Sequence, residues 1–202
     1  MPRQRLITKS RSAAQSEHRR LILRVTLRYI EPAIWREISV PDAYSLAQLH
    51  RCIQLSFDWL DYHLFLFEVA GRQFARAEPD ALGEDAAAVR LADLPLKARS
   101  AFLYVYDMGD GWEHDIEVRS TEAISLADPD HLAYVLDGAR AGPPEDVGGP
   151  PGYDHLIQAL RSRRTVDDED LIAWAGPDFD PERFDRRAVN HGLVLASAWG
   201  VI

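Results

Sequence analysis

Cysteine is almost absent from this chain: Cys52 is the single cysteine among 202 residues. A disulfide within the chain and a cysteine-cluster zinc site are therefore excluded, and a reducing compartment is favoured. The sequence also lacks an apolar run of about 20 residues, the length that a membrane span needs. The basic N-terminal segment has no apolar centre of the kind found in secretory signals. We therefore expect a cytoplasmic protein without a membrane partner.

Positive charge is scarce outside the N-terminal segment. Residues 1–24 contain seven Lys or Arg and one acid, Glu17, and so carry +6. Because the whole chain carries −9, residues 25–202 carry −15. An acidic body repels phosphate backbones, which confines any nucleic-acid binding to residues 1–24. The alternative for this segment is a solvated terminal arm, since it lacks interspersed aromatic residues.

The folded part is predicted to begin with a hairpin followed by a helix. Residues 21–30 alternate in the manner of a strand, Glu31-Pro32 turns the chain, and residues 34–40 form a returning strand. Ser45 can cap the next helix. The apolar face of that helix consists of Leu46, Leu49, Ile53 and Phe57.

Several antiparallel strands and three helices are predicted to follow. Strands are expected over 63–69, 102–106 and 112–118, with a surface loop over 76–90 and an irregular Gly/Pro-rich segment over 138–152. Helices are expected over about 153–161, 166–175 and 185–196. This order predicts an α+β fold: an antiparallel sheet with a β-grasp-like core of hairpin, helix and strands, and C-terminal helices. We expect residues 1–20 to be a basic arm and residues 21–202 a single domain.

The segment YDMGDGWEHDIEV, residues 106–118, contains the strongest chemical candidates. An EF-hand calcium loop is excluded, because its first and third ligand positions would be Tyr106 and Met108, which have no carboxylate. A hairpin fits better: glycines and aspartates form the turn, and alternation places Trp112 inward and Glu113 outward. In this interpretation Asp107 and Asp110 form the turn.

Three histidines lie on apolar faces of three different predicted elements. His114 shares a face with Trp112, His63 shares one with the phenylalanines of residues 63–69, and His50 lies beside the apolar stripe of the helix. One hypothesis is a shared pocket that contains these histidines with Asp110 or Glu145, because histidine is a common metal ligand and acid/base group. The alternative is three separate histidines, each with its own carbonyl or carboxylate partner.

Other motifs are weaker. The segment GARAGPPEDVGGPPGYD, residues 138–154, has glycines before a helix but lacks the Gly-Lys-Ser/Thr ending of a P-loop. Three roles are open for its acids Glu145 and Asp146: part of a functional site, residues of a turn, or a helix cap. No G-x-S-x-G nucleophile elbow is present, and Cys52 falls within a helix as a small apolar group. Nucleophilic catalysis is therefore not supported.

Four segments together resemble the Ri-plasmid open-reading-frame-three-like family over roughly residues 21–192. They are PAIWREISVPDAYSLAQLHRCIQLSFDWLDYHLFLFEV, YDMGDGWEHDIEV, GARAGPPEDVGGPPGYDHLIQAL and FDPERFDRRAVN. The resemblance implies an α+β domain of bacteria and archaea, associated with plasmids or mobile elements, without an established activity. Matching positions include Trp35, Arg36, Leu49, His50, Trp59, His63, Asp107, Gly109, Asp110, Trp112, His114, Pro144, Glu145, Asp146, Gly148, Gly149, Gly152 and Tyr153.

The chain departs from the family pattern at Gly142 and Val147, where many relatives have cysteines. Some relatives carry a transposon-resolvase label. A resolvase needs a nucleophilic serine supported by arginines in a folded domain and, in addition, a DNA-binding module. This chain, with its acidic body, has neither, so the label finds no support. We predict a binding module for a protein or small ligand. The alternatives are a metal-dependent, hydrolase-like enzyme and nucleic-acid association through the basic arm. The candidate pocket residues are His50, His63, Asp110, Trp112, His114, Glu145 and Asp146, with no cofactor and no metal assigned.

Overall fold

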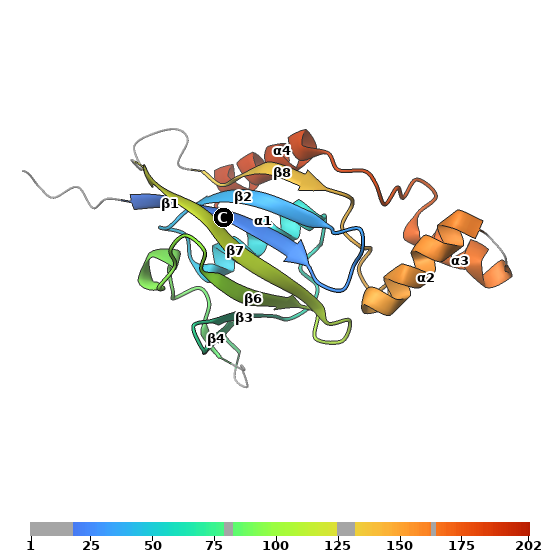
Figure 1. Cartoon of the computed structure of the whole chain (residues 1–202), viewed down its shortest axis with the longest axis horizontal. Helices are drawn as coiled ribbons and strands as arrows, with labels where there is room; N and C mark the ends of the chain where they lie inside the picture. The colour runs from blue at the N-terminus through green and yellow to red at the C-terminus, as the bar shows by residue number, and fades with distance from the viewer. Residues whose placement is uncertain (1–17, 79–82, 125–131, 163–164) are drawn as a thin grey trace, which may run out of the picture.

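The computed structural model describes residues 18–78, 83–124, 132–162 and 165–202 (Figure 1). In this part of the chain, eight strands form one curved sheet in the order β5-β4-β3-β6-β7-β1-β2-β8. The strands are β1 His18–Leu27, β2 Trp35–Pro41, β3 Phe65–Val69, β4 Arg72–Ala75, β5 Glu84–Asp85, β6 Ala101–Tyr106, β7 Trp112–Ile124 and β8 Tyr134–Ala139. The helices are α1 Leu46–Phe57, the 3-10 turn η1 Leu91–Asp93, α2 Gly149–Ser162, α3 Val166–Ala175 and α4 Arg186–Ala198.

The first hairpin, β1 and β2, lies inside the sheet between β7 and the edge strand β8. β1 pairs antiparallel with β2 on one side and with β7 on the other. β1 begins at His18, so residues 18–20 are part of the sheet and not of the predicted arm; the rest of that arm lies outside the described residues. The fold also engages basic side chains of this strand: Arg19 binds the carboxylate of Asp42, and the guanidinium of Arg24 lies over the ring of Trp35.

The predicted helix α1 and its N-cap are confirmed. Ser45 forms a capping box with Gln48, and Asp58 ends the helix with a left-handed backbone conformation. All four residues of the predicted apolar face are buried. This face packs onto the sheet, as the ring contacts of Phe57 with His114 and of His50 with Tyr104 demonstrate.

The predicted hairpin of residues 102–106 and 112–118 is also confirmed. β6 and β7 pair antiparallel, with Tyr106 opposite Trp112 and Tyr104 opposite His114. Trp112 and His114 are buried, whereas Glu113 is half-buried on the other face. The alternation of side chains along a strand therefore fixes the inward position of both predicted residues.

Three sequence-based predictions are corrected. The described sheet is mixed, because β4 and β5 run parallel. His63 precedes β3 and does not belong to it, since its backbone N–H points to the hydroxyl of Tyr106 instead of a neighbouring strand. The segment 138–152 is partly regular: β8 reaches Ala139, and α2 begins at Gly149 because prolines are compatible with the first turn of a helix. The β-grasp-like arrangement stays a prediction.

The last three helices lie in two places. α2 and α3 pack against each other to one side of the sheet, and α4 lies along β8 (Figure 1). Tyr153 and Leu156 of α2 are buried in the same core as the sheet residues, so α2 is fixed to the domain. Within the described residues, none of the helices has the length and apolar character needed to cross a bilayer.

Candidate functional site

Three loops meet at one end of the sheet. We call them the helix-end loop (residues 58–64), the hairpin turn (residues 107–111) and the PPED loop (residues 140–148). The helix-end loop joins α1 to β3, the hairpin turn joins β6 to β7, and the PPED loop joins β8 to α2. Two of the segments that resemble the family, residues 106–118 and 138–154, thus come together here.

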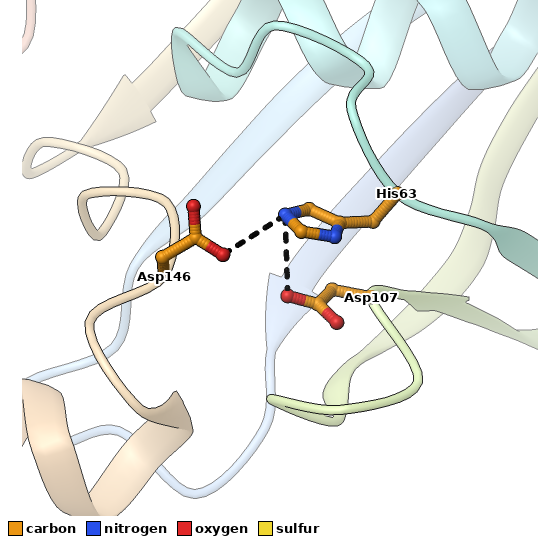
Figure 2. A group of neighbouring side chains, drawn as sticks. All are labelled: His63, Asp107 and Asp146. Atoms are coloured by element: carbon orange, nitrogen blue, oxygen red, sulfur yellow. Dashed lines mark ion pairs between the residues drawn. The ribbon is translucent and has the colours of Figure 1, made fainter.

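His63 lies between two carboxylates at this meeting point (Figure 2). Its Nε2 is 3.2 Å from Oδ1 of Asp146 and 3.6 Å from Oδ2 of Asp107. The three potential donor atoms all lie within 4.8 Å of one another. The Nε2 is shielded from solvent, yet it makes no hydrogen bond within the described part of the chain. This is the arrangement of one nitrogen and two oxygens that can hold a metal ion.

Asp107 is held by the backbone of its own turn. Its Oδ1 accepts hydrogen bonds from the backbone N–H groups of Gly109, at 2.9 Å, and Asp110, at 3.3 Å. Asp107 itself has a φ of 54°, a conformation in which aspartate is tolerated better than most residues. With Oδ1 occupied, Oδ2 remains directed at His63. The turn-forming role predicted for Asp107 is therefore compatible with a second role in the site.

The PPED loop positions Asp146 through its neighbours. The carboxylate of Glu145 accepts hydrogen bonds from the hydroxyl of Tyr106 and from the backbone N–H of Leu60. On the other side, Val147 is buried. Asp146 itself is exposed and has a φ of 60°, which turns its carboxylate toward His63. Glu145 thus fixes the loop, and Asp146 faces the site.

The hairpin turn and the PPED loop are also joined directly. Oδ2 of Asp110 accepts the backbone N–H of Gly148, at 3.1 Å. A Cβ atom at Gly149 would lie 2.3 Å from the carbonyl oxygen of Asp110, so only glycine permits this approach. Asp110 is therefore a connecting residue between the two motifs. Its carboxylate lies outside the group of His63, Asp107 and Asp146, which we call the metal-like group.

The aromatic rings of Trp59, Tyr106 and Trp112 pack in the core beneath these loops. The indole N–H of Trp59 donates to the carbonyl of Pro143, at 2.8 Å. The Trp59 ring stacks on Tyr106 at a centroid distance of 5.0 Å and lies 6.2 Å from Trp112. Trp112, a predicted pocket residue, thus supports the loops from within the core and does not face the metal-like group.

His50 has two partners of its own. Its Nδ1 lies 2.8 Å from the hydroxyl of Tyr104, and its Nε2 lies 2.9 Å from Oδ1 of Asp61. Its ring stacks on Phe65 at 3.8 Å. Burial lowers the pKa of His50 below its ordinary value despite the opposing effect of Asp61, so the imidazole is neutral near pH 7.

His114 is fully buried under α1. Its Nδ1 donates to the carbonyl of Trp112, at 3.0 Å, and its ring packs edge-on against Phe57 and Trp59. Burial lowers the pKa of His114 to about 3. With Nδ1 carrying the proton, Nε2 is a buried acceptor without a hydrogen-bond partner among the described residues.

The structure therefore divides the predicted pocket residues. His63 and Asp146 belong to the metal-like group, Asp110 and Glu145 fasten its loops, and Trp112, His114 and His50 lie in the core behind it. Sequence reasoning assigned Asp107 to the turn alone and missed its second carboxylate oxygen. The signal was present, because Asp107 occupies a matching position of the resembled family next to the other motif residues.

Comparisons with known proteins give one matching family model and two relatives of similar length. The protein-family model described as plasmid pRiA4b ORF-3-like protein matches residues 19–188. The uncharacterized protein y4hQ of Sinorhizobium fredii is 30% identical over 184 residues, which cover 88% of this chain and 92% of that protein. The crystal structure of MM3350 from Methanosarcina mazei Go1, a protein of unknown function, is similar with a TM-score of 0.76 and 32% identity. That match covers 85% of this chain and 98% of MM3350.

Proposed function

The chain belongs to the plasmid pRiA4b ORF-3-like family, and we propose that it is a binding module built around a divalent metal ion. The protein ligands are Nε2 of His63 and one carboxylate oxygen each of Asp107 and Asp146. One observation carries this proposal: Nε2 is buried between two carboxylates and makes no hydrogen bond within the described residues. A cation at this point satisfies all three groups at once.

The distances support a shared ion. Two donor atoms that each lie about 2.1 Å from one metal are about 3.0 Å apart at a right angle and about 3.4 Å apart at the tetrahedral angle. The separations of 3.2 and 3.6 Å around Nε2 are close to these values. Both separations that involve Nε2 thus fit a shared ion, and the two carboxylate oxygens lie within 4.8 Å of each other.

The donor set also indicates the kind of ion and the kind of role. One imidazole nitrogen with two carboxylate oxygens suits zinc, manganese or iron(II) better than calcium, which prefers six to eight oxygens. Three protein ligands leave coordination positions open for a small ligand or for a side chain of a partner protein. The bound ion would supply the attraction for that ligand, and His63, Asp107 and Asp146 would hold the ion in place.

A binding role is favoured over a hydrolytic one by the state of the neighbouring acids. Glu145 accepts hydrogen bonds from Tyr106 and Leu60, and Asp110 accepts one from Gly148. A general base needs a free acceptor within reach of the reacting proton. Both carboxylates next to the metal-like group hold the loops together, a structural role that accounts for them without catalysis.

The test is metal binding by untagged, metal-free protein. Isothermal titration with zinc, manganese and cobalt should give one ion per chain for at least one metal. His63→Ala and Asp146→Asn should each weaken that affinity at least about ten-fold, because the first removes a ligand and the second replaces a charged ligand with a neutral one. Cobalt should in addition give a visible absorption spectrum that His63→Ala removes.

Matched controls use a histidine and an aspartate elsewhere on the surface. His191 of α4 and Asp154 of α2 are exposed and lie outside the metal-like group. His191→Ala and Asp154→Asn should leave the affinity unchanged. Equal affinity in the wild-type protein and in His63→Ala would mean that His63 only forms ion pairs with the two aspartates, and the proposal would then be wrong.

A further inference from the structure

We propose a second binding site, distinct from the metal-like group, for a small organic carboxylate with an apolar body. The site is a pocket of about 460 Å³ between α1, the helix-end loop and the segment around β5. Its volume falls within the range of small-molecule sites. The residues that give it its chemistry are His50, Arg51, Asp61, Phe65 and Arg76, and Asp85 and four alanines complete its lining.

The inner part of the pocket is a rigid aromatic pair. His50 and Phe65 are both buried and stack at 3.8 Å with an interplanar angle of 15°. The tautomer of His50 follows from its partners. The carboxylate of Asp61 can only accept, so Nε2 carries the proton, and Nδ1 of the neutral ring then accepts from the hydroxyl of Tyr104.

A second set of hydrogen bonds fixes this arrangement. The side-chain amide nitrogen of Gln54 donates to the hydroxyl oxygen of Tyr104, at 3.0 Å, and its amide oxygen accepts the backbone N–H of Asp61, at 3.1 Å. The donor and acceptor directions around Tyr104, His50 and Asp61 are thus mutually consistent. The polar groups of the pocket are organised before any ligand arrives, which reduces the entropic cost of binding.

The lining contains two arginines and two aspartates, and one of the arginines makes no direct ion pair among the described residues. Oδ1 of Asp61 accepts from Arg76, at 2.7 Å, as well as from His50, so the charge of this aspartate is compensated. Arg51 lines the same pocket and acts on His50 and Asp61 only through its charge, with no hydrogen bond or ion pair to another residue in the described part of the chain. A guanidinium binds a carboxylate through two parallel hydrogen bonds. Asp85, also on the lining, disfavours a more highly charged anion such as a phosphate.

The apolar residues of the lining indicate the polarity of the remainder of the ligand. Ala47, Ala77, Ala86 and Ala87 line the pocket together with the aromatic pair, so the lining contains no long polar side chain besides its charged residues. Such walls accept a flat or compact apolar body and offer it few polar partners. The combination of an unpaired arginine and alanine walls fits an aromatic or branched monocarboxylate.

Binding, and not catalysis, is the role that these groups support. Both ring nitrogens of His50 already have partners, so the imidazole has no free position for proton transfer. His50 and Arg76 hold the pKa of Asp61 below its ordinary value although burial opposes this, so its carboxylate is a weak base. A general base is most effective with a pKa near the working pH, and this pocket does not provide one.

Benzoate and its uncharged analogue benzamide are suitable probes, because they differ chiefly in charge. Titrations of the methyl-labelled full-length protein, followed by nuclear magnetic resonance, should shift the methyl signals of the pocket alanines with benzoate. Benzamide should bind at least about ten-fold more weakly. Arg51→Gln should remove that preference, because the arginine contributes the charge-assisted contact. Ala87→Leu should weaken the binding of both probes, because the larger side chain occupies part of the pocket.

The controls separate this site from the metal-like group and from general charge effects. Arg161→Gln alters an exposed arginine near the end of α2 and should leave benzoate binding unchanged. His63→Ala should also leave it unchanged in metal-free protein. Loss of benzoate binding in His63→Ala, equal binding of benzoate and benzamide, or unchanged binding by a folded Arg51→Gln would each overturn the proposal.

Discussion

The hydroxyl of Tyr106 donates a hydrogen bond to the carboxylate of Glu145, a residue 39 positions further along the chain. The same oxygen accepts the backbone N–H of Tyr62, at 3.1 Å. One side chain at the end of β6 thus joins the PPED loop and the helix-end loop, which contribute Asp146 and His63 to the proposed metal site. Burial, with Glu145 beside it, raises the pKa of Tyr106 above its ordinary value, so the hydroxyl keeps its proton.

Tyr106→Phe should weaken metal binding without removing a metal ligand. Loss of the hydroxyl frees Glu145 and leaves the N–H of Tyr62 without its acceptor, so His63 and Asp146 are no longer held in register. We expect a loss of about ten-fold in metal affinity and of about 1–3 kcal/mol in the free energy of unfolding. Isothermal titration and urea denaturation measure the two quantities.

Tyr29→Phe is the matched control, because the Tyr29 hydroxyl is exposed and makes only a long contact with Glu113. This variant should resemble the wild-type protein in both measurements. If Tyr106→Phe lost stability but bound metal normally, the tyrosine would support the fold alone.

Asp107→Asn separates the two roles of Asp107. The amide oxygen of asparagine can still accept from the N–H groups of Gly109 and Asp110, so the hairpin turn should persist. Its amide nitrogen replaces the oxygen that faces His63 and cannot bind a metal ion. We expect a loss of at least about ten-fold in metal affinity with a change in unfolding free energy below about 1 kcal/mol.

The counterpart is Asp110→Asn, since Asp110 bonds to Gly148 and lies outside the metal-like group. This variant should keep most of the metal affinity. Greater loss in Asp110→Asn than in Asp107→Asn would show that the ligands have been assigned to the wrong aspartate.

Local patterns in the sequence were sufficient for the elements that depend on periodicity. The stripe of α1 and the alternation around Trp112 and His114 follow directly from the repeat of a helix and of a strand. These patterns also located the two loop motifs correctly. They could not reveal that His63 leaves the strand, because the acceptor that draws its backbone away is the hydroxyl of Tyr106, 43 residues later.

The assembly of the site depended on such distant contacts. Asp107 lies on a turn, and its second carboxylate oxygen becomes available to His63 only because the first is occupied by the turn backbone. The partners of His50 and His114 are likewise separate, which agrees with the alternative of individually satisfied histidines. The face of a helix and the alternation along a strand predict whether a side chain is buried or exposed. They do not predict which buried side chains contact one another.

His114 should make stability depend on pH. Its pKa is about 3 in the folded protein and about 6.5 in the unfolded chain, so between these values the unfolded chain binds the extra proton. Acidification from pH 7 therefore favours unfolding, by at most about 1.4 kcal/mol per pH unit from this group, and the effect levels off below about pH 3. Urea denaturation between pH 4.5 and 7 measures this slope.

His114→Asn should flatten that slope, because asparagine does not titrate and its amide can still donate to the carbonyl of Trp112. The variant should be less stable at pH 7, since it leaves part of the ring volume empty. His191→Asn, at an exposed position of α4, should leave the slope unchanged. Parallel pH profiles for the wild-type protein and His114→Asn would contradict the assignment.

Two glycine substitutions test the junction between the hairpin turn and the PPED loop. Gly149 has a φ of 66°, and an added Cβ would lie 2.3 Å from the carbonyl oxygen of Asp110. Gly149→Ala must therefore push the two loops apart, with a cost of at least about 1–2 kcal/mol from the backbone conformation alone. Because the same loops contribute Asp107 and Asp146, metal affinity should fall together with stability.

Gly192→Ala is the opposite case and provides the control. Gly192 lies within α4, has no left-handed backbone conformation, and an added Cβ would meet no atom within 4 Å. Alanine is favoured over glycine in a helix, so this variant should gain about 0.5–1 kcal/mol and bind metal as the wild-type protein does. Thermal denaturation and metal titration of both variants distinguish a steric requirement at the junction from a general effect of replacing glycine. Normal metal affinity in Gly149→Ala would mean that the contact between the two motifs does not position the ligands.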